Sequence, residues 1–266
     1  MDLPIPDIAS LIDDVPDTLR VLICFGLTLL LVILRFDAER FNAAEYDDID
    51  RWGRPPSLLR RLAWYLMGIG GVFAVAFIYP DPSEGLYLML GDRVGTVVLG
   101  LAYGAIGVAV AVGIALIRYG YVRFPPVTSY PVKFINAIAT AFVDEAVFRG
   151  IVFALLVSTS MNPNLANLIQ ALLYALATRL GAPGRPWYML ASMLVIGLVG
   201  GWLTGITGGI GAAFLGHAIT RIAIFLTTGH AGIPKPRGTE DEEVARRRAT
   251  PKGWQVLGSG DSPRDH

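Results

Sequence analysis

Residues 134–157 read FINAIATAFVDEAVFRGIVFALLV, a stretch that is long and apolar enough to cross a membrane but carries charges near its centre. A helix that spans a hydrocarbon core of about 30 Å needs roughly 20 mostly apolar residues. Asp144 and Glu145 are the only acidic residues between positions 94 and 234. Because a charge at the centre of a membrane helix costs about 2.5 to 3.5 kcal/mol on insertion scales, we expect this pair to have a function.

The composition of the whole chain also indicates a membrane protein. Of its 266 residues, 53% are hydrophobic and 17% are charged, whereas soluble domains carry about 25% charged residues. The 22 basic and 22 acidic residues cancel, which argues against a nucleic-acid partner. One cysteine and three scattered histidines predict no disulfide and no structural zinc site, and we expect no metal and no organic cofactor.

Six other apolar windows accompany residues 134–157. Together they predict an all-α fold, a polytopic membrane bundle of about seven transmembrane helices whose backbone hydrogen bonds are satisfied inside each helix. The other six windows are residues 19–34, 62–79, 94–117, 165–177, 187–203 and 206–226.

The distribution of Lys and Arg predicts the orientation of these spans, because cytoplasmic loops collect basic residues. The basic segments alternate along the chain with acidic or uncharged ones, which predicts a multi-pass protein with its N-terminus outside and its C-terminus in the cytoplasm. The acidic N-terminus lacks the basic region of a cleavable signal peptide, so we expect the first span to remain. The basic segments are residues 35–61, 118–133, 179–185 and 235–252.

Charged residues in two of the spans are spaced for contact on one helix face. Glu145 and Arg149 are four residues apart, and Asp144 lies about 100° round the same helix. His217 and Arg221 repeat the four-residue spacing in the last span. These groups are either catalytic or structural. In the structural alternative, Asp144, Glu145 and Arg149 form ion pairs that hold helices together, and His217 and Arg221 form a packing hydrogen bond and an ion pair between helices.

Three short motifs resemble those of a known family. The sequence DEAVFRG at 144–150 resembles the first motif, E-E-x-x-x-R, of the CPBP family of intramembrane endopeptidases, which includes type II CAAX prenyl proteases and bacteriocin-processing proteins. The sequence LLYALAT at 172–178 resembles the second motif, F-x-x-x-H, and HAITR at 217–221, after a glycine turn at 207–209, resembles the third, H-x-x-x-N. The resemblance covers about residues 132–225.

The resemblance implies roles for these residues. In the family, the first carboxylate and the second-motif histidine activate a water, and the third-motif histidine and asparagine stabilise the oxyanion. Carried over, Asp144 is the catalytic carboxylate, and Glu145 with Arg149 is its supporting pair. His217 and Arg221 are the oxyanion donors. Tyr174 and Thr178 either line the pocket or only pack.

This chain departs from the family motifs at three positions. Asp144 replaces a glutamate, Thr178 replaces the second-motif histidine, and Arg221 replaces the asparagine. Two functions are therefore possible, and in both of them membrane lipid is a partner of the protein. One is an endopeptidase that hydrolyses a peptide bond in a membrane-bound or prenylated peptide. The other is an inactive relative that binds a peptide or lipid, or acts as a scaffold. A transporter is less favoured, because no inverted repeat is evident.

We divide the chain into four segments on this basis. Residues 1–17 are an acidic, non-cytoplasmic N-terminus, and residues 18–131 hold three transmembrane helices. Residues 132–229 are a CPBP-like four-helix core, and residues 230–266 are a flexible, charged cytoplasmic tail. We expect the protein in the inner membrane of a bacterial cell.

Glycine and proline residues predict details of packing and turns. Gly197 and Gly201 are expected to let two helices approach closely. Gly205, Gly208 and Gly209 are expected to form the turn between the last two spans. Residues 162–164, Asn-Pro-Asn, predict a turn with the proline outside the following helix.

Overall fold

The structure of the chain is a computed structural model that describes residues 15–41, 43, 57–119, 122, 130–180 and 188–228. All regular structure in these ranges is helical, which confirms the predicted all-α class. The long elements are α2 (Asp17–Phe36), α3 (Leu58–Ile78), α5 (Arg93–Tyr119), α6 (Tyr130–Glu145), α8 (Pro163–Leu180), α9 (Tyr188–Thr207) and α10 (Gly211–Thr228). The short ones are η1 (Ala38–Phe41), α4 (Pro82–Gly85), η3 (Ala146–Val152) and α7 (Phe153–Ser158).

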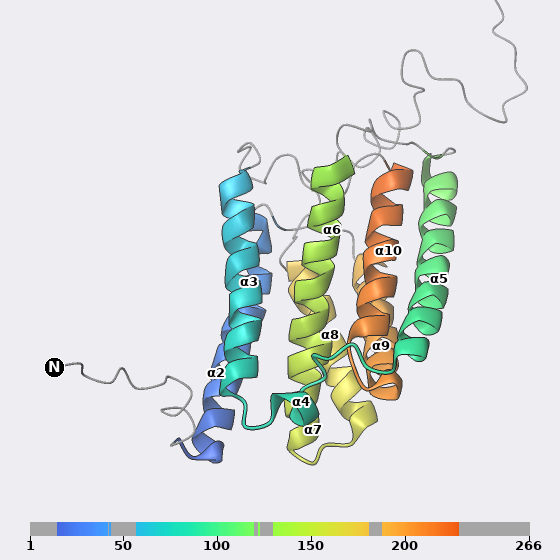
Figure 1. Cartoon of the computed structure of the whole chain (residues 1–266). Helices are drawn as coiled ribbons and strands as arrows, with labels where there is room; N and C mark the ends of the chain where they lie inside the picture. The colour runs from blue at the N-terminus through green and yellow to red at the C-terminus, as the bar shows by residue number, and fades with distance from the viewer. Residues whose placement is uncertain are drawn as a thin grey trace, which may run out of the picture.

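The long helices stand side by side and alternate in direction (Figure 1). Helices α2, α5, α8 and α10 run one way, and α3, α6 and α9 run the other way. Because α6, η3 and α7 follow one another without a break, residues 130–158 form one crossing. The predicted helical membrane bundle is thereby confirmed, and the end of α2 and the start of α3 lie at the same end as the last turn of α10.

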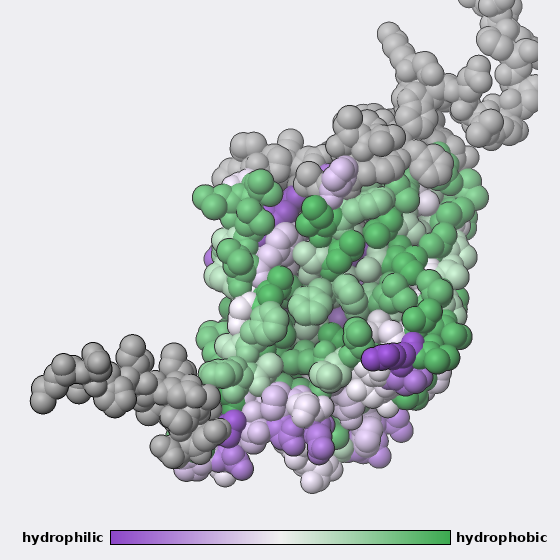
Figure 2. Space-filling model, in the orientation of Figure 1, coloured by the Kyte–Doolittle hydropathy of each residue, from purple (hydrophilic) through white to green (hydrophobic). Residues whose placement is uncertain are grey.

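Apolar side chains cover the outside of the bundle, as they must in lipid. A broad hydrophobic band crosses the face shown in Figure 2. Large side chains such as Leu66 and Phe73 are 72% and 66% exposed. Four helical segments, Asp17–Phe36, Leu58–Ile78, Arg93–Ile117 and Leu190–Thr207, are long and apolar enough to cross a membrane. The protein is an integral membrane protein.

The turn between the last two helices differs from the prediction. Helix α9 continues to Thr207 and α10 begins only at Gly211, so the predicted start of the last span at residue 206 is wrong. Gly205 lies inside α9, not in the turn. Gly208 and Gly209 do form the turn, where Gly208 has a φ of +72° that favours glycine.

The start of α8 also corrects a prediction. Pro163 is the first residue of that helix, although it was expected to lie outside it. Proline is tolerated there, because the first N–H groups of a helix have no partner within the helix. The preceding Asn162 accepts a hydrogen bond from the Asn164 N–H at 2.9 Å.

Glycines allow the close helix contacts that surround the site. A Cβ atom placed on Gly197 of α9 would lie 2.8 Å from the Ala171 Cβ of α8, and Gly201 packs against Asn167 and Gln170 of α8. These contacts confirm the predicted packing role of Gly197 and Gly201. On α5, Gly100, Gly104 and Gly107 pack in the same way against α10.

The segment that follows α4 links several helices at one end of the bundle. The Tyr87 N–H donates to the Gly150 carbonyl of η3 at 3.3 Å. The Ile210 N–H donates to the Met89 carbonyl at 3.0 Å, and the Asp92 N–H donates to the Thr207 carbonyl at 2.7 Å. These main-chain contacts fix the start of α10, which carries His217 and Arg221.

Candidate functional site

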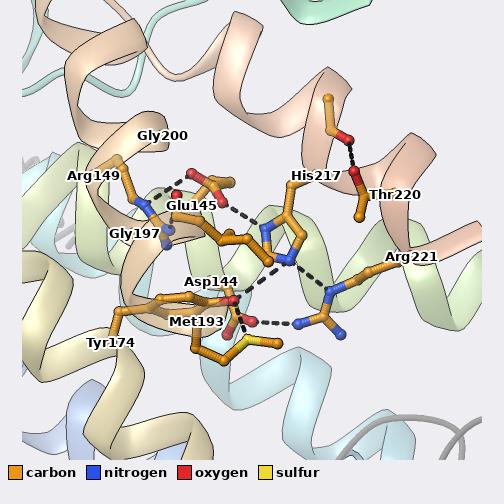
Figure 3. A network of polar contacts seen from close by, with 12 residues as sticks. Asp144, Glu145, Arg149, Tyr174, Met193, Gly197, Gly200, His217, Thr220 and Arg221 are labelled. Atoms are coloured by element: carbon orange, nitrogen blue, oxygen red, sulfur yellow. Dashed lines mark hydrogen bonds and ion pairs between the residues drawn. The ribbon is translucent and has the colours of Figure 1, made fainter. Parts of the chain in front are cut away.

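The predicted site residues come together in the interior of the bundle (Figure 3). Asp144 and Glu145 end helix α6, and Arg149 lies in η3. These three side chains are 0% exposed, and His217 and Arg221 on α10 are each 3% exposed. Side chains from distant parts of the sequence therefore share one buried polar cluster.

Both carboxylate oxygens of Asp144 accept hydrogen bonds from arginine side chains. The Arg35 Nε lies 2.7 Å from Oδ1 and its Nη2 lies 3.4 Å from Oδ2. The Arg221 Nη2 lies 2.6 Å from Oδ2. Such charge-assisted bonds are about twice as strong as neutral ones. Asp144 is thus held between the last turn of α2 and the middle of α10.

Arg35 is a site residue that the sequence did not reveal. Its side chain is 3% exposed, although the sequence placed it among the cations of a loop. A basic residue directly after an apolar span is typical of a membrane boundary, so this position gave no signal of its own. The information was missing because a sequence does not show which helices are neighbours.

Glu145 contacts two other groups. Its Oε1 lies 2.5 Å from His217 Nδ1. Its Oε2 forms an ion pair with Arg149 Nε at 3.2 Å. The two atoms are too poorly aligned for a hydrogen bond, and neither Oε2 nor Nε has another hydrogen-bond partner among the described residues. The Arg149 Nη2 donates to the Ile196 carbonyl of α9 at 3.3 Å. The predicted shared face of Glu145 and Arg149 is therefore observed.

The hydrogen bonds of His217 assign its tautomer. Arg221 Nε lies 2.9 Å from His217 Nε2, and a guanidinium group can only donate. Nε2 is therefore the acceptor, and Nδ1 carries the hydrogen that is donated to Glu145. In this arrangement Nε2 has no hydrogen to offer to an oxyanion, so donation from His217 would require a different state of the ring.

Helix α8 contributes an aromatic wall to the cluster. Tyr174 is 0% exposed, and its ring lies 4.1 Å from the centre of the Arg149 guanidinium. Its hydroxyl lies 3.4 Å from His217 Nε2 and donates to the Met193 sulfur at 3.7 Å. Thr178, one turn further along α8, is 1% exposed, and its hydroxyl has no hydrogen-bond partner among the described residues.

The local backbone at the site is a π-helix rather than an α-helix. It covers Ala146–Val152, and the Phe153 N–H donates to the Phe148 carbonyl five residues earlier. Short π-helical segments are frequent at functional sites. The sequence predicted a continuous helix over residues 134–157, and the change of helix type had no signature in the hydropathy.

No group of three or more His, Cys, Asp or Glu side chains that could hold a metal ion occurs within the described ranges. The polar cluster consists instead of carboxylate, guanidinium and imidazole groups paired with one another. Its chemistry is hydrogen bonding and charge pairing between residues of the chain.

A comparison of the chain with known protein families found a match that covers most of the site. The family described as type II CAAX prenyl endopeptidase Rce1-like matches residues 126–223. We call residues 126–223 the Rce1-like core because of this similarity. The Rce1-like core contains the seven residues predicted for the site, whereas Arg35 lies outside it. This core is thus similar to an intramembrane protease-type family. No curated protein and no solved structure matches the chain.

Proposed function

We propose that the protein is a catalytically inactive CPBP relative that uses its protease-type core to bind a membrane-associated peptide without hydrolysing it. The observation that carries this proposal is the pairing of Asp144. Both of its oxygens accept hydrogen bonds from Arg35 and Arg221. A carboxylate oxygen can accept more than one hydrogen bond, but here both oxygens are bound to guanidinium groups, which compete with the water that a catalytic carboxylate must hold at about 2.6 to 3.2 Å.

The residue types at the other motif positions support the same proposal. By the resemblance, Thr178 stands where the family has a histidine base. A threonine hydroxyl does not take up a proton near neutral pH, and loss of a general base lowers a rate by about 10² to 10⁴. Arg221 stands where the family has an oxyanion-binding asparagine, and its Nε and Nη2 are bonded to His217 and Asp144.

A binding role explains why the charges are retained. Replacing a buried ion-pair network by well-packed apolar residues is often neutral or stabilising, so stability alone gives little reason to keep five charged groups and a histidine in this interior. A peptide is the ligand that we propose, because the matched family is one of endopeptidases. The proposal applies to prenylated and to unprenylated peptides.

Peptide hydrolysis is a second candidate, and one contact favours it. The 2.5 Å contact between Glu145 and His217 Nδ1 is the arrangement in which a carboxylate orients an imidazole that acts as a base. His217 Nε2 could then activate a water, provided that Arg221 moved away from it.

The proposal is tested with the full-length protein in lipid nanodiscs and a library of palmitoylated and prenylated decapeptides. Fluorescence anisotropy measures binding above the level of empty nanodiscs, because a lipid chain partitions into the bilayer by itself, and mass spectrometry examines the recovered peptide. We expect that peptides of the library bind to the protein and that all of them are recovered uncleaved. Cleavage by the native protein that is lost in Asp144→Asn would contradict the proposal, and so would the absence of binding across the library.

A gain-of-function variant tests the reason given for inactivity. Thr178→His with Arg221→Asn and Arg35→Leu restores the family residues at two motif positions and releases Asp144 from both arginines. We expect this variant to cleave peptides that the native protein only binds. The matched control carries the same three changes together with Asp144→Asn and should not cleave. Equal activity of the variant and its control would contradict the assigned role of Asp144.

A further inference from the structure

Three of the buried site residues, Glu145, Arg149 and Thr178, have atoms without a hydrogen-bond partner among the described residues. Glu145 Oε2 and Arg149 Nη1 form no hydrogen bond with any described residue, although both side chains are 0% exposed. An unmade hydrogen bond of a buried polar atom is expensive, and native interiors contain few of them. These two atoms therefore call for a third group that supplies one donor and one acceptor.

The neighbourhood of these atoms is shaped by a glycine and an aromatic ring. A Cβ on Gly200 of α9 would lie 3.0 Å from Arg149 Nε and 3.4 Å from Glu145 Oε2. The Arg149 guanidinium is held over the Tyr174 ring at 4.1 Å and donates to the Ile196 carbonyl through Nη2. Arg149 is thus fixed on two sides. Its Nε is ion-paired with Glu145 Oε2 at 3.2 Å, which leaves Nη1 to bind a further acceptor.

We propose that Glu145 and Arg149 bind the main chain of one residue of an extended peptide. The N–H of that residue donates to Glu145 Oε2, and its C=O accepts from Arg149 Nη1. In an extended chain the N–H and C=O of one residue point to the same side, as they do when paired strands exchange both hydrogen bonds. This inference rests on the proposed peptide binding and specifies how the ligand is recognised. The recognised feature is its backbone, so the side chain of that residue need not contribute.

The test is a scan of the tightest-binding palmitoylated decapeptide in which each backbone N–H is methylated in turn. Methylation removes the donor for Glu145 Oε2 at one position. A hydrogen bond to a charged group in a buried site contributes enough that we expect a loss of affinity of about tenfold or more at that position. Methylation that weakens binding less than about twofold at every position would overturn the inference. In that case the binding of the unmethylated parent peptide would still support the proposed function. Failure of the parent peptide to bind would overturn both.

A pair of alanine variants connects the sensitive position to this site. Gly200→Ala places a methyl group against Glu145 and Arg149, whereas a Cβ on Gly205 of the same helix meets no atom within 4 Å. We expect the methylation penalty to fall below about twofold in Gly200→Ala and to remain in Gly205→Ala. An unchanged penalty in Gly200→Ala would overturn the inference. If Gly200→Ala does not fold, Glu145→Gln is measured in its place with the same expectation, because an amide oxygen that stays with His217 puts an NH2 group where Oε2 accepts the peptide N–H.

Discussion

Asp144 and Glu145 are adjacent in the chain, but their side chains contact different partners. Asp144 joins α2 to α10, and Glu145 joins His217 to the π-helical segment. The four-residue spacings predicted which residues of one helix would face the same way. They could not predict that Arg35 completes the cluster, since that contact spans 109 positions in the sequence.

The double pairing of Asp144 predicts a large effect on stability. Asp144→Asn leaves Arg35 and Arg221 buried without their carboxylate, and breaking a buried pair in this way costs about 3 to 5 kcal/mol. Melting temperature in detergent should fall accordingly. The matched control is Asp37→Asn, which removes an exposed ion pair to Arg40 at 3.4 Å and should cost less than about 1 kcal/mol. Equal losses in the two variants would contradict the assigned pairing.

At the scale of helices, the apolar windows of the sequence predicted that a helix is present. They predicted less well where each helix begins and ends and whether it is an α-helix or a π-helix. The hydropathy of residues 134–157 shows a crossing segment, but it is insensitive to the five-residue hydrogen bond that makes Ala146–Val152 a π-helix. The turn at Gly208 and Gly209 was predicted correctly, but the start of the last span was predicted at residue 206 and α10 begins at Gly211. The residues at the end of α9 and at the start of α10 are all uncharged, so hydropathy does not separate the two helices.

The contact between α5 and α10 gives a prediction at this scale. A Cβ on Gly107 would lie 2.7 Å from the Cβ of Thr220, whereas one on Gly113 of the same helix meets nothing within 4 Å. Gly107→Ala should therefore destabilise the protein by about 1 to 3 kcal/mol through overpacking. Gly113→Ala should be neutral or slightly stabilising, because alanine favours helix. Thermal unfolding in detergent compares them, and a stable Gly107→Ala would mean that α5 packs elsewhere.

For the whole molecule, the sequence predicted the class of fold but not which helices pack together. The Rce1-like core covers residues 126–223, and α2 lies outside it, yet α2 supplies Arg35 to the site. The first long helix therefore takes part in the site, a relation that neither composition nor the family motifs indicate.

The predicted orientation of the bundle is tested by labelling with a membrane-impermeant thiol reagent. In a Cys24→Ser background, Ser83→Cys, at an exposed position of α4, should react in intact cells. Ser259→Cys in the C-terminal tail should react only after the cells are permeabilised. The reverse pattern would contradict the orientation inferred from the basic loops.

The most direct test of the central claim, that this protease-type core binds peptides without hydrolysing them, uses water labelled with oxygen-18. Hydrolysis of any peptide bond places that oxygen in a new carboxylate, so mass spectrometry detects turnover whatever the peptide. The native protein, incubated with the lipidated peptide library, should produce no labelled peptide above the level of empty nanodiscs. Labelled products that disappear in His217→Gln or Asp144→Asn would contradict the claim and identify the protein as an active protease.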